Sequence, residues 1–438
     1  MQARRGERRK RFRKELVINL IIGLGIGAVL FAIRDLPRFK DVEDTSFDWF
    51  IQIRQASAGK DAPAFAIIDI DEKTYRATGQ PYYTSRKNLL TLLRFAAEAN
   101  PRLIILDFDL SRPGSEPLEE EALADFFRDY DGPAPIIGIQ PVVRSLVDPG
   151  LPRIHRPTAL RDISAGNPNI YWGAALVTVD EDMTVRRWRV WEKSCTQDGR
   201  PEVLIPIQVI SSLLLEYGPP VHERVEEARQ RIYAEVPFDC PGERGSGSRP
   251  ERSRATVDAG AHDVFIQPTW NESRILYSFP WAAATGSEWS NAEHLVIRPA
   301  LPILSAGGAD VANDWLTDRV VVISGSYDEG GDVHRTPLGE MPGSLVIVNS
   351  IHSLVSRGQV IEPPLWVTLG FYAVAILVMS ILFARFDSFW GMVFSGALVI
   401  AALVPLTFYG YNQGVWVNFT LPLTAVWWQR IARRLPGD

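Results

Sequence analysis

Two pairs of aspartates are the side chains whose spacing points most clearly to chemistry. Asp69 and Asp71 lie in the run IIDIDE, Asp107 and Asp109 lie in LDFDL, and both runs are typical of buried strands. Because alternate residues of a strand point to one face, the members of each pair are expected to share a face. In parallel neighbouring strands these carboxylates could meet at the carboxyl edge of the sheet. Ligands of open α/β sheets usually bind there, and oxygen ligands could hold a cation.

A structural role is the alternative for the same carboxylates. Each could cap the helix after its strand or pair with Arg86, Arg186 or Arg187. A buried carboxylate needs a partner, and an arginine serves as well as a metal ion. The pattern is therefore compatible with a ligand site and with a set of structural ion pairs, and it does not identify a metal ion.

The segment GSYDEGGDVHRTPLGEMPG, residues 325–343, is the most unusual on the chain. Its glycines and prolines predict a long, shaped loop between a strand and a helix, which presents Asp332, His334 and Thr336. His334 with Asp332 could form an acid–base couple, or a metal site with the strand-end carboxylates. The chain has no nucleophile elbow, HExxH, CxxC or phosphate-binding GKS/T motif. We therefore expect a structural or ligand-contacting loop, with no catalysis and no cofactor.

Short β-rich apolar runs alternate with helical patterns between residues 41 and 362, and these elements would position the polar residues. Strands are expected at residues 64–70 and 103–110, separated by a helical pattern at 85–100. This order is a β-α-β unit and predicts an α/β mixed-sheet domain. Residues 319–324 and 344–356 predict a last strand and helix.

Hydrophobic segments long enough to cross a bilayer flank this domain. Residues 16–33 are almost wholly apolar, and residues 365–384 and 390–409 are long and uncharged. Residues 415–428 are shorter and include Asn418, so a helix lying in the membrane interface is the alternative there. The fold class expected is an α/β mixed-sheet domain with α-helical membrane segments, one N-terminal and three C-terminal.

The distribution of charge sets the expected topology. Residues 1–15 carry eight Lys or Arg and two Glu, so the positive-inside rule places the N-terminus in the cytoplasm. No small-residue cleavage site follows residues 16–33, which favours a retained anchor over a signal peptide. Four spans would return the tail at 429–438, with three arginines, to the cytoplasm and leave residues 41–362 outside. The chain has a net charge of -6, and because both ends are positively charged, residues 16–362 carry -14, which argues against nucleic acid as a partner.

The two cysteines of the chain, Cys195 and Cys240, both lie in this exported segment. In an oxidising compartment they could form a disulfide. The spacing of the cysteines in sequence is equally compatible with two free thiols, because the separation of the Cα atoms decides whether the disulfide can form.

An ordered set of motifs runs through residues 41–362. The motifs are FDWFIQIR at 47–54, IIDIDEKTY and GQPYYTSR at 67–86, LIILDFDLSRP at 103–113, DEDMTVRRW at 180–188, YSFPW at 277–281, the loop at 325–343 and VIVNSIHSLVSRG at 346–358. Together they resemble the type 2 CHASE domain. The sequence departs from this family at one turn, where the usual DGxxR is DMTVR, with Met183 where a glycine would relax the backbone.

The resemblance implies an extracytoplasmic sensory domain of bacterial receptors, preceded by one membrane helix and followed by three. We expect a multi-pass protein of the bacterial inner membrane with both termini in the cytoplasm. The chain ends about ten residues after the last expected span. A stand-alone form without an output domain is therefore expected, with a separate cytoplasmic or membrane signalling partner. Receptors with a single N-terminal membrane helix are often dimers, so a homodimer is one possible assembly of this protein.

The ligand expected is an unknown extracytoplasmic one. The residues nominated to contact it are Asp69, Asp71, Arg86, Asp107, Asp109, Asp332, His334 and Thr336. Two other functions stay open. One is a metal-dependent ectoenzyme that uses the strand-end carboxylates and His334, and the other is an accessory or scaffold subunit of a membrane complex.

Overall fold

A computed structural model gives the architecture of the chain. It describes residues 2–33, 37–54, 63–81, 83–143, 153–155, 158–196, 198–240, 255–266, 271–281, 293–308, 311–360, 365–386, 389–391, 393–398, 401 and 405. The chain divides into two compact units, and each is described by itself. One unit is Ile51–Gln359, and the other is Met1–Phe50 with Val360–Asp438.

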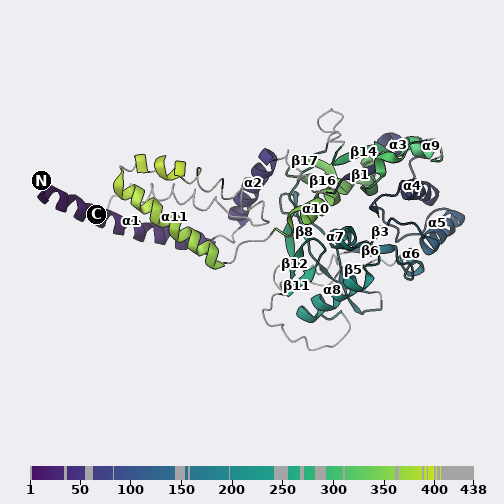
Figure 1. Ribbon diagram of the computed structural model, residues 1–438, viewed down its shortest axis with the longest axis horizontal. Helices are drawn as coiled ribbons and strands as arrows, with labels where there is room; N and C mark the ends of the chain where they lie inside the picture. Colours follow the sequence, from purple (N-terminus) through teal and green to yellow (C-terminus); the bar gives the residue numbers. More distant parts are fainter. Residues whose placement is uncertain are drawn as a thin grey trace. The chain divides into compact units, whose positions relative to one another are not determined.

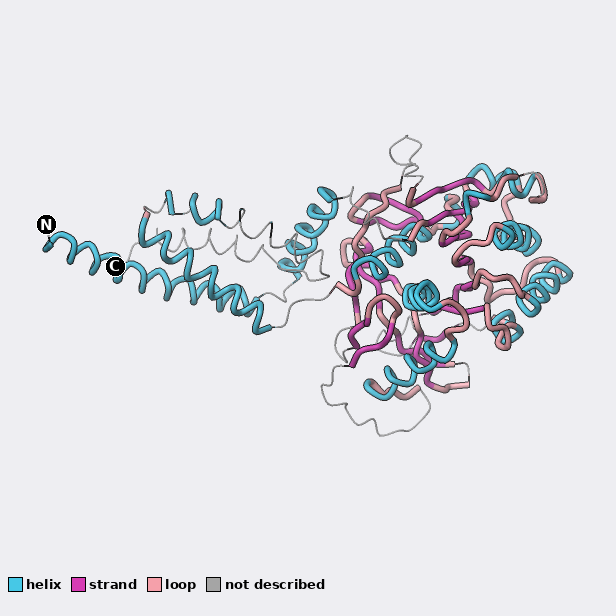
Figure 2. The backbone as a smooth tube through the Cα atoms, in the orientation of Figure 1, coloured by secondary structure: helices cyan, strands magenta, loops and turns pink. Residues whose placement is uncertain are grey.

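A six-stranded parallel sheet forms the centre of the unit Ile51–Gln359 (Figures 1 and 2). Its strands are apolar on both faces, as expected of a parallel sheet that helices cover on both sides. In order across the sheet they are β14 (Leu295–Pro299), β1 (Phe65–Ile70), β15 (Val320–Gly325), β2 (Leu103–Leu106), β3 (Ile136–Ile139) and β6 (Ile170–Gly173).

Alternate residues of the central strands face opposite helical layers. Ala66, Ile68 and Ile70 of β1 belong to the larger core cluster, which one helical layer covers. That layer contains α3 (Glu72–Ala77), α4 (Arg86–Glu98), α5 (Pro117–Asp129), α6 (Ala159–Ile163) and α9 (Leu301–Ser305). The other face of the sheet packs against α7 (Ile207–Tyr217) and α10 (Gly343–Arg357).

Smaller elements surround α7 and α10. A hairpin of β16 (Val333–Thr336) and β17 (Gly339–Pro342) precedes α10 directly, and the turn η3 (Asp328–Gly330) precedes the hairpin. The other elements are β13 (Glu272–Arg274), β8 (Val185–Arg189) and β7 (Val177–Val179) in one sheet; β10 (Pro201–Leu204), β9 (Glu192–Cys195), β5 (Arg153–His155) and β4 (Val142–Val143) in another; β11 (Ala255–Asp258) with β12 (Asp263–Ile266); and α8 (His222–Glu235) and η2 (Asp314–Leu316).

Cys195 and Cys240 form a disulfide, with Cα atoms 5.9 Å apart and a sequence separation of 45. The bond joins β9 to the segment that follows α8. It closes a covalent ring that contains β10, α7 and α8.

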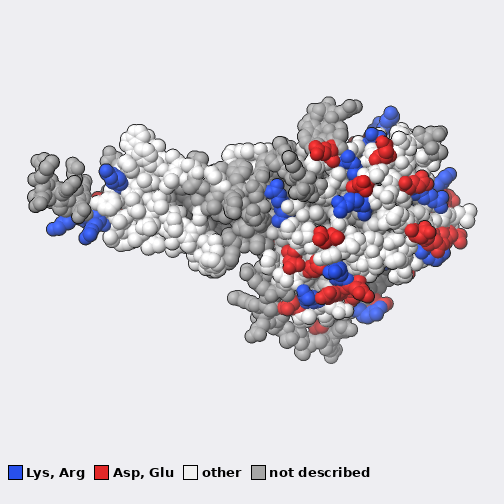
Figure 3. Space-filling model, in the orientation of Figure 1, with Lys and Arg blue, Asp and Glu red and all other residues white. Residues whose placement is uncertain are grey.

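The other unit contains, wholly or partly, α1 (Gln2–Ile33), α2 (Pro37–Arg54) and α11 (Leu365–Arg385). Helix α1 packs on α11 where glycines allow close approach, because a Cβ at Gly23 or Gly27 would lie 2.8 or 2.9 Å from Ile376. Nearby, Asn19 Nδ2 donates to the Ser380 carbonyl over 3.5 Å. The described surface of α11, and of α1 beyond its N-terminal turns, is largely free of charge, whereas both signs are scattered over Ile51–Gln359 (Figure 3).

Among the described residues, one helix is long and apolar enough to cross a membrane, at Trp366–Arg385. It coincides with the span expected at residues 365–384. The span expected at 16–33 lies within α1, which also takes in the basic residues before it. Of the spans expected at 390–409 and 415–428, only a short apolar helix at Phe389–Leu398 is partly described. The remainder and the tail at 429–438 lie outside the described residues, so the number of spans stays a prediction.

Two expectations about local structure were wrong. Strand β2 ends at Leu106, so Asp107 and Asp109 follow the strand and do not lie in it. Their apolar neighbours suggested a longer strand, but pairing of β2 with β15 stops at Leu106, whereas β15 continues beside β1 to Gly325. The segment at 325–343, expected as a loop, contains a turn and the β16–β17 hairpin.

Candidate functional site

Three polar residues lie side by side at the carboxyl edge of the sheet, on β1, β15 and the end of β2. Asp69 of β1 is in register with Ser324 of β15. Ile323 is in register with Leu106, and the Asp107 amide donates to the Ile323 carbonyl over 2.9 Å, so Asp107 is the next residue across. Neighbouring strands lie about 4.8 Å apart. The sequence interpretation that placed Asp69 and Asp107 at one sheet edge therefore agrees with this geometry.

Asp69 and Ser324 form the buried floor of this edge. Asp69 is 5% exposed and Ser324 is 1% exposed. Asp69 Oδ2 accepts a hydrogen bond from Ser326 Oγ at 2.6 Å. Asp69 Oδ1 and Ser324 Oγ are buried and have no partner among the described residues. Burial raises the pKa of Asp69 to about 6, although the Ser326 hydrogen bond acts in the opposite direction.

The β16–β17 hairpin brings a second pair of side chains to the same edge. His334 Nε2 lies 3.0 Å from Asp332 Oδ1. Asp107 interacts with both: burial and, to a smaller extent, the charge of Asp332 raise the pKa of Asp107, and His334 lowers it, with a net result of about 7. The hydrogen bond that His334 donates to Asp332 raises the pKa of His334, and the charges of Asp332 and Asp107 add to the effect, while burial opposes it.

The Asp332 carboxylate lies against the first turn of α10. The Gly343 amide donates to the Asp332 carbonyl at 2.9 Å, and a Cβ at Gly343 would overlap the Asp332 carboxylate oxygens. A glycine is therefore required where α10 begins. The carboxylate is therefore placed at the positive end of the helix dipole.

Helix α10 is buried from Gly343 to Leu354, and polar side chains fix its position. Asn349 Oδ1 accepts from the amides of Ser278 and Phe279 at 2.8 and 2.9 Å, and its Nδ2 donates to the Phe279 carbonyl at 3.0 Å. Ser353 Oγ accepts from the Leu276 amide at 3.1 Å. These bonds give the YSFPW motif its role, which is to hold the chain against α10. Sequence reasoning missed this role, although an asparagine within an apolar helix is a signal for it.

A further hydrogen bond joins α10 to α7. Gln208 Nε2 donates to Ser350 Oγ over 2.7 Å, and Ser350 Oγ in turn donates to the Ile347 carbonyl. Both side chains are buried. Polar contacts therefore hold α10 to elements on two sides, since a buried polar group left without its partner is costly.

Several nominated residues have local structural roles and do not join this cluster. Asp71 caps α3, since its Oδ1 accepts from the Thr74 amide at 2.8 Å, as the capping alternative predicted. Asp109 Oδ1 accepts from the Ser111 amide at 2.8 Å. Thr336 Oγ1 donates to the Gly339 carbonyl at 2.7 Å and stabilises the β16–β17 turn.

Arg86 is neither beside the aspartates nor paired with them, which corrects the sequence interpretation. Its Nε lies 2.8 Å from Glu120 Oε2, and it also donates to the Arg112 carbonyl. The pairing partner comes from α5, which sequence spacing could not indicate because the two residues meet only after α4 and α5 pack.

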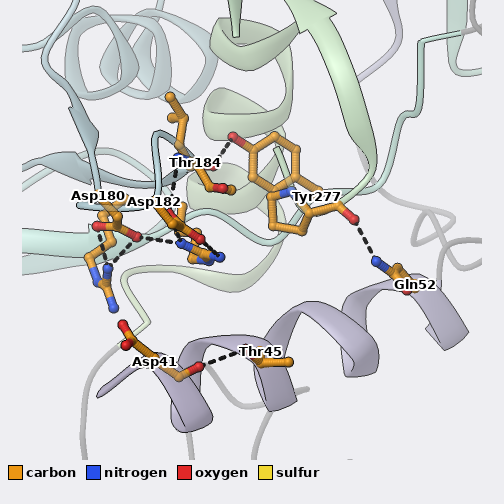
Figure 4. A network of polar contacts seen from close by, with 11 residues as sticks. Asp41, Thr45, Gln52, Asp180, Asp182, Thr184 and Tyr277 are labelled. Carbon is orange, nitrogen blue, oxygen red and sulfur yellow. Dashed lines mark hydrogen bonds and ion pairs between the residues drawn. The ribbon is translucent and has the colours of Figure 1, made fainter. Parts of the chain in front are cut away.

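Arg186 and Arg187 also pair elsewhere, within the β7–β8 hairpin (Figure 4). Arg186 Nη2 lies 2.7 Å from Asp182 Oδ2, and Arg187 Nη1 lies 2.6 Å from Asp180 Oδ1. The hydrogen bond from Arg186 holds the pKa of Asp182 well below its usual value. Between them, Met183 has a φ of +63°, so the turn keeps the left-handed conformation that a glycine would favour.

The β16–β17 hairpin contacts two further segments. A parallel bridge joins Thr184 of the β7–β8 turn to Arg335. At the turn of the hairpin, the Pro337 carbonyl accepts from Gln52 Nε2 at 3.0 Å, and Gln52 lies in the last turn of α2 (Figure 4). The hairpin that presents His334 is therefore in contact with the first residues of the unit Ile51–Gln359.

No group of three or more His, Cys, Asp or Glu side chains in the described part of the chain is placed to hold a metal ion. The carboxyl edge instead offers acceptor oxygens on Asp69, Ser324 and Asp107, with the Asp332–His334 pair beside them.

The chain was compared with known proteins. A family described as the CHASE2 domain matches residues 25–384. No curated protein and no solved structure gives a match. CHASE2 domains are extracytoplasmic sensory domains, which agrees with the resemblance found in the motifs. With most of its length matched, the chain belongs to the CHASE2 family.

Proposed function

We propose that this protein is a non-catalytic sensor of the bacterial inner membrane. Its unit Ile51–Gln359 lies outside the cytoplasm, receives a signal at the carboxyl edge of the sheet, and passes it through membrane helices to a separate signalling partner. The observation that supports the proposal is the position of the two ends of α10. This helix begins at Gly343 beside Asp332, and seven residues separate its end at Arg357 from the start of α11 at Leu365.

Helix α10 is suited to this role because it is a single buried rod. Its 15 residues span about 22 Å at 1.5 Å per residue. A displacement at Gly343 would therefore reach Arg357 and the segment that leads to α11. A ligand can drive such a change only through a difference in affinity for the two positions of the helix.

The contact of Gln52 with Pro337 supports a second connection. Gln52 belongs to α2, which follows α1 in the chain, and Pro337 lies in the hairpin that carries His334. A change at the hairpin would thus reach both the N-terminal and the C-terminal connections of the sensory unit.

The topology proposed has four spans and both termini in the cytoplasm. The basic residues of α1, the apolar helix at Trp366–Arg385 and the disulfide of the sensory unit all support this orientation. The output is supplied by a partner protein, and a homodimer is the assembly proposed.

Cross-linking between α1 and α11 tests the transmission. With Gly27→Cys and Ile376→Cys introduced together, the rate of oxidative cross-linking in native membranes reports how these helices pack, since the two residues are in contact. Asp332→Ala and His334→Ala should each change this rate at least threefold. Asp328→Ala is the matched control, because this aspartate lies in the same segment but is exposed.

Equal cross-linking rates in all three variants, at equal amounts of protein in the membrane, would exclude transmission from the hairpin. Protease added outside spheroplasts tests the orientation separately. It should cleave within residues 51–359, and protection of this unit would contradict the proposed topology.

A further inference from the structure

Three titratable side chains gather where the β16–β17 hairpin meets the carboxyl edge of the sheet. His334 Nε2 lies 3.0 Å from Asp332 Oδ1, and these side chains are 27% and 45% exposed. Asp107 follows the end of β2 and is half-buried. Its charge acts on His334, and both members of the pair act on Asp107. The cluster therefore joins the hairpin to the central sheet through groups that can each gain or lose a proton.

The elements packed around the cluster bring few other charges to it. Across the hairpin His334 is in register with Met341, whereas Arg335 and Glu340 are in register with each other and are exposed. Helix α10 has no charged side chain between Gly343 and Ile351. The charged residues of the nearby β7–β8 hairpin are ion-paired with one another: Asp180, Asp182, Arg186 and Arg187. The charge of the cluster is thus set mainly by its own three members.

Asp332 connects the cluster to α10. Its carboxylate oxygens occupy the place that a Cβ would take on Gly343, and its carbonyl accepts from the Gly343 amide at 2.9 Å. Before Asp332 comes Gly331, which has a φ of +64° and where a Cβ would meet no atom within 4 Å. A force on the Asp332 carboxylate therefore acts directly on the first turn of α10, and the residue before it imposes no side-chain contact on the backbone.

We propose that Asp107, Asp332 and His334 form a proton-binding site, at which the sensory unit reads the acidity outside the cytoplasm. This inference rests on the proposed function and names the signal for the same site. With protons on His334 and Asp107, the imidazolium pairs with the Asp332 carboxylate and the neutral Asp107 does not oppose the pair. With both protons lost, the two carboxylates repel each other, and the neutral imidazole offers a hydrogen bond alone. The hairpin is therefore held to α10 at acid pH and released at alkaline pH.

The pKa values of the cluster place this exchange of protons near neutral pH. Burial and, to a smaller extent, the charge of Asp332 bring the pKa of Asp107 to about 7, although His334 opposes them. The hydrogen bond to Asp332 raises the pKa of His334 above its ordinary value of 6.5. Protons can drive a change in the hairpin because the held position binds them more tightly than the released one.

Asp69 and His352 also have shifted pKa values, but they lie outside the cluster. Asp69, with a pKa of about 6, is bound to Ser326 and feels the charge of Asp71. His352, buried in α10 between aromatic rings, takes up its proton only near pH 4. A response of the hairpin between pH 6 and pH 8 that depends on Asp107 and His334 is therefore specific to the proposed site.

Hydrogen–deuterium exchange of the purified full-length chain in detergent, at pH 6, 7 and 8, tests the inference. Peptides that cover residues 332–345 report on the hairpin and the first turn of α10, after correction for the intrinsic pH dependence of exchange. In the parent protein, their protection should fall by about threefold or more from pH 6 to pH 8.

Two variants should change this profile in opposite directions. Asp107→Asn should keep most of the protection at pH 8, because the amide resembles the neutral carboxyl. His334→Gln should lose protection already at pH 6, because the imidazolium is absent. Asp328→Asn, which replaces an exposed aspartate of the same segment, should follow the parent protein. Comparison of variants at the same pH removes the intrinsic pH dependence altogether.

The inference is overturned if the corrected protection of the parent protein does not change between pH 6 and pH 8, or if Asp107→Asn and His334→Gln both follow the parent profile. Protection of the central strand β2 shows whether each variant is folded, and the parent profile decides alone where a variant is not. The cross-linking experiment is done at one pH, so a hairpin that does not titrate leaves its result intact. Equal cross-linking rates would remove the signalling role even if the hairpin titrates.

Discussion

The imidazole Nε2 of His334 lies 3.0 Å from the Asp332 carboxylate, and that carboxylate rests against the first residue of α10. One ion pair therefore connects an exposed hairpin to the N-terminus of a buried helix. Because Asp107 acts on both members of the pair, a change of charge at the sheet edge also changes the environment of the helix. The predictions below test the parts of this arrangement one at a time.

Gly343→Ala should disrupt this contact, because the added Cβ would overlap the Asp332 carboxylate. We expect the free energy of unfolding to fall by about 1–3 kcal/mol, measured by urea denaturation. The double variant Gly343→Ala with Asp332→Ala should recover most of the loss. Gly166→Ala is the control, since a Cβ there meets no atom within 4 Å. An equal effect at both glycines would refute the assignment.

Met183→Gly should stabilise the sensory unit. Met183 is 70% exposed and adopts a φ of +63°, a conformation that costs a side chain with a Cβ roughly 1–2 kcal/mol. We expect the unfolding free energy to rise by about 1 kcal/mol. Met183→Ala keeps the Cβ and should show no gain, which separates backbone strain from loss of the methionine side chain. A gain of equal size in both variants would contradict this explanation.

Asp107→Asn should stabilise the unligated protein at high pH. The pKa of Asp107 is about 7 in the fold, above its ordinary value of 3.8, so ionisation of this carboxyl costs stability as the pH rises through this window. At pH 8 the free energy of unfolding of the variant should exceed that of the parent protein by about 1 kcal/mol. At pH 4, where Asp107 in the folded parent and the asparagine in the variant are both neutral, the difference should be small. Chemical denaturation at the two pH values measures the difference. A gain that does not depend on pH would show that the charge of Asp107 is not its source.

His352 should give a pH dependence of the opposite sign. Its ring lies between Phe65 and Phe279 and is 2% exposed, neither ring nitrogen has a partner among the described residues, and burial lowers its pKa to about 4. The unfolded chain binds this proton near pH 6.5, so stability should fall as the pH drops from 6.5 towards 4, by up to about 3 kcal/mol. His352→Leu should remove this part of the acid sensitivity. If the variant loses as much stability as the parent protein between pH 6.5 and pH 4, groups other than His352 cause the acid sensitivity.

The sequence predicts the central elements well because their signal is local. The apolar runs around Ile68 and Ile104 and the helical pattern of residues 85–100 predict β1, β2 and α4, since periodicity depends only on neighbouring residues. The convergence of Asp69 and Asp107 at one edge also follows from parallel neighbours in a sheet.

The partners of side chains could not be predicted in the same way. Arg86 was a candidate partner for the aspartates, but it pairs with Glu120, and Asp71 caps its own helix. Which charges meet depends on how α4 and α5 pack, and nothing in the spacing of the residues fixes that. The roles of Asn349 and Ser353 also appear only when the YSFPW segment lies against α10.

The ring closed by the disulfide between Cys195 and Cys240 also affects the stage at which the fold is completed. Helix α7 lies inside this ring, and its Gln208 holds Ser350 of α10. Thiols pair in oxidising compartments and stay reduced in the cytosol. On the proposed topology this disulfide forms only after translocation, so we expect the ring that carries α7, and with it the support of α10 through Gln208, to be closed outside the cytoplasm.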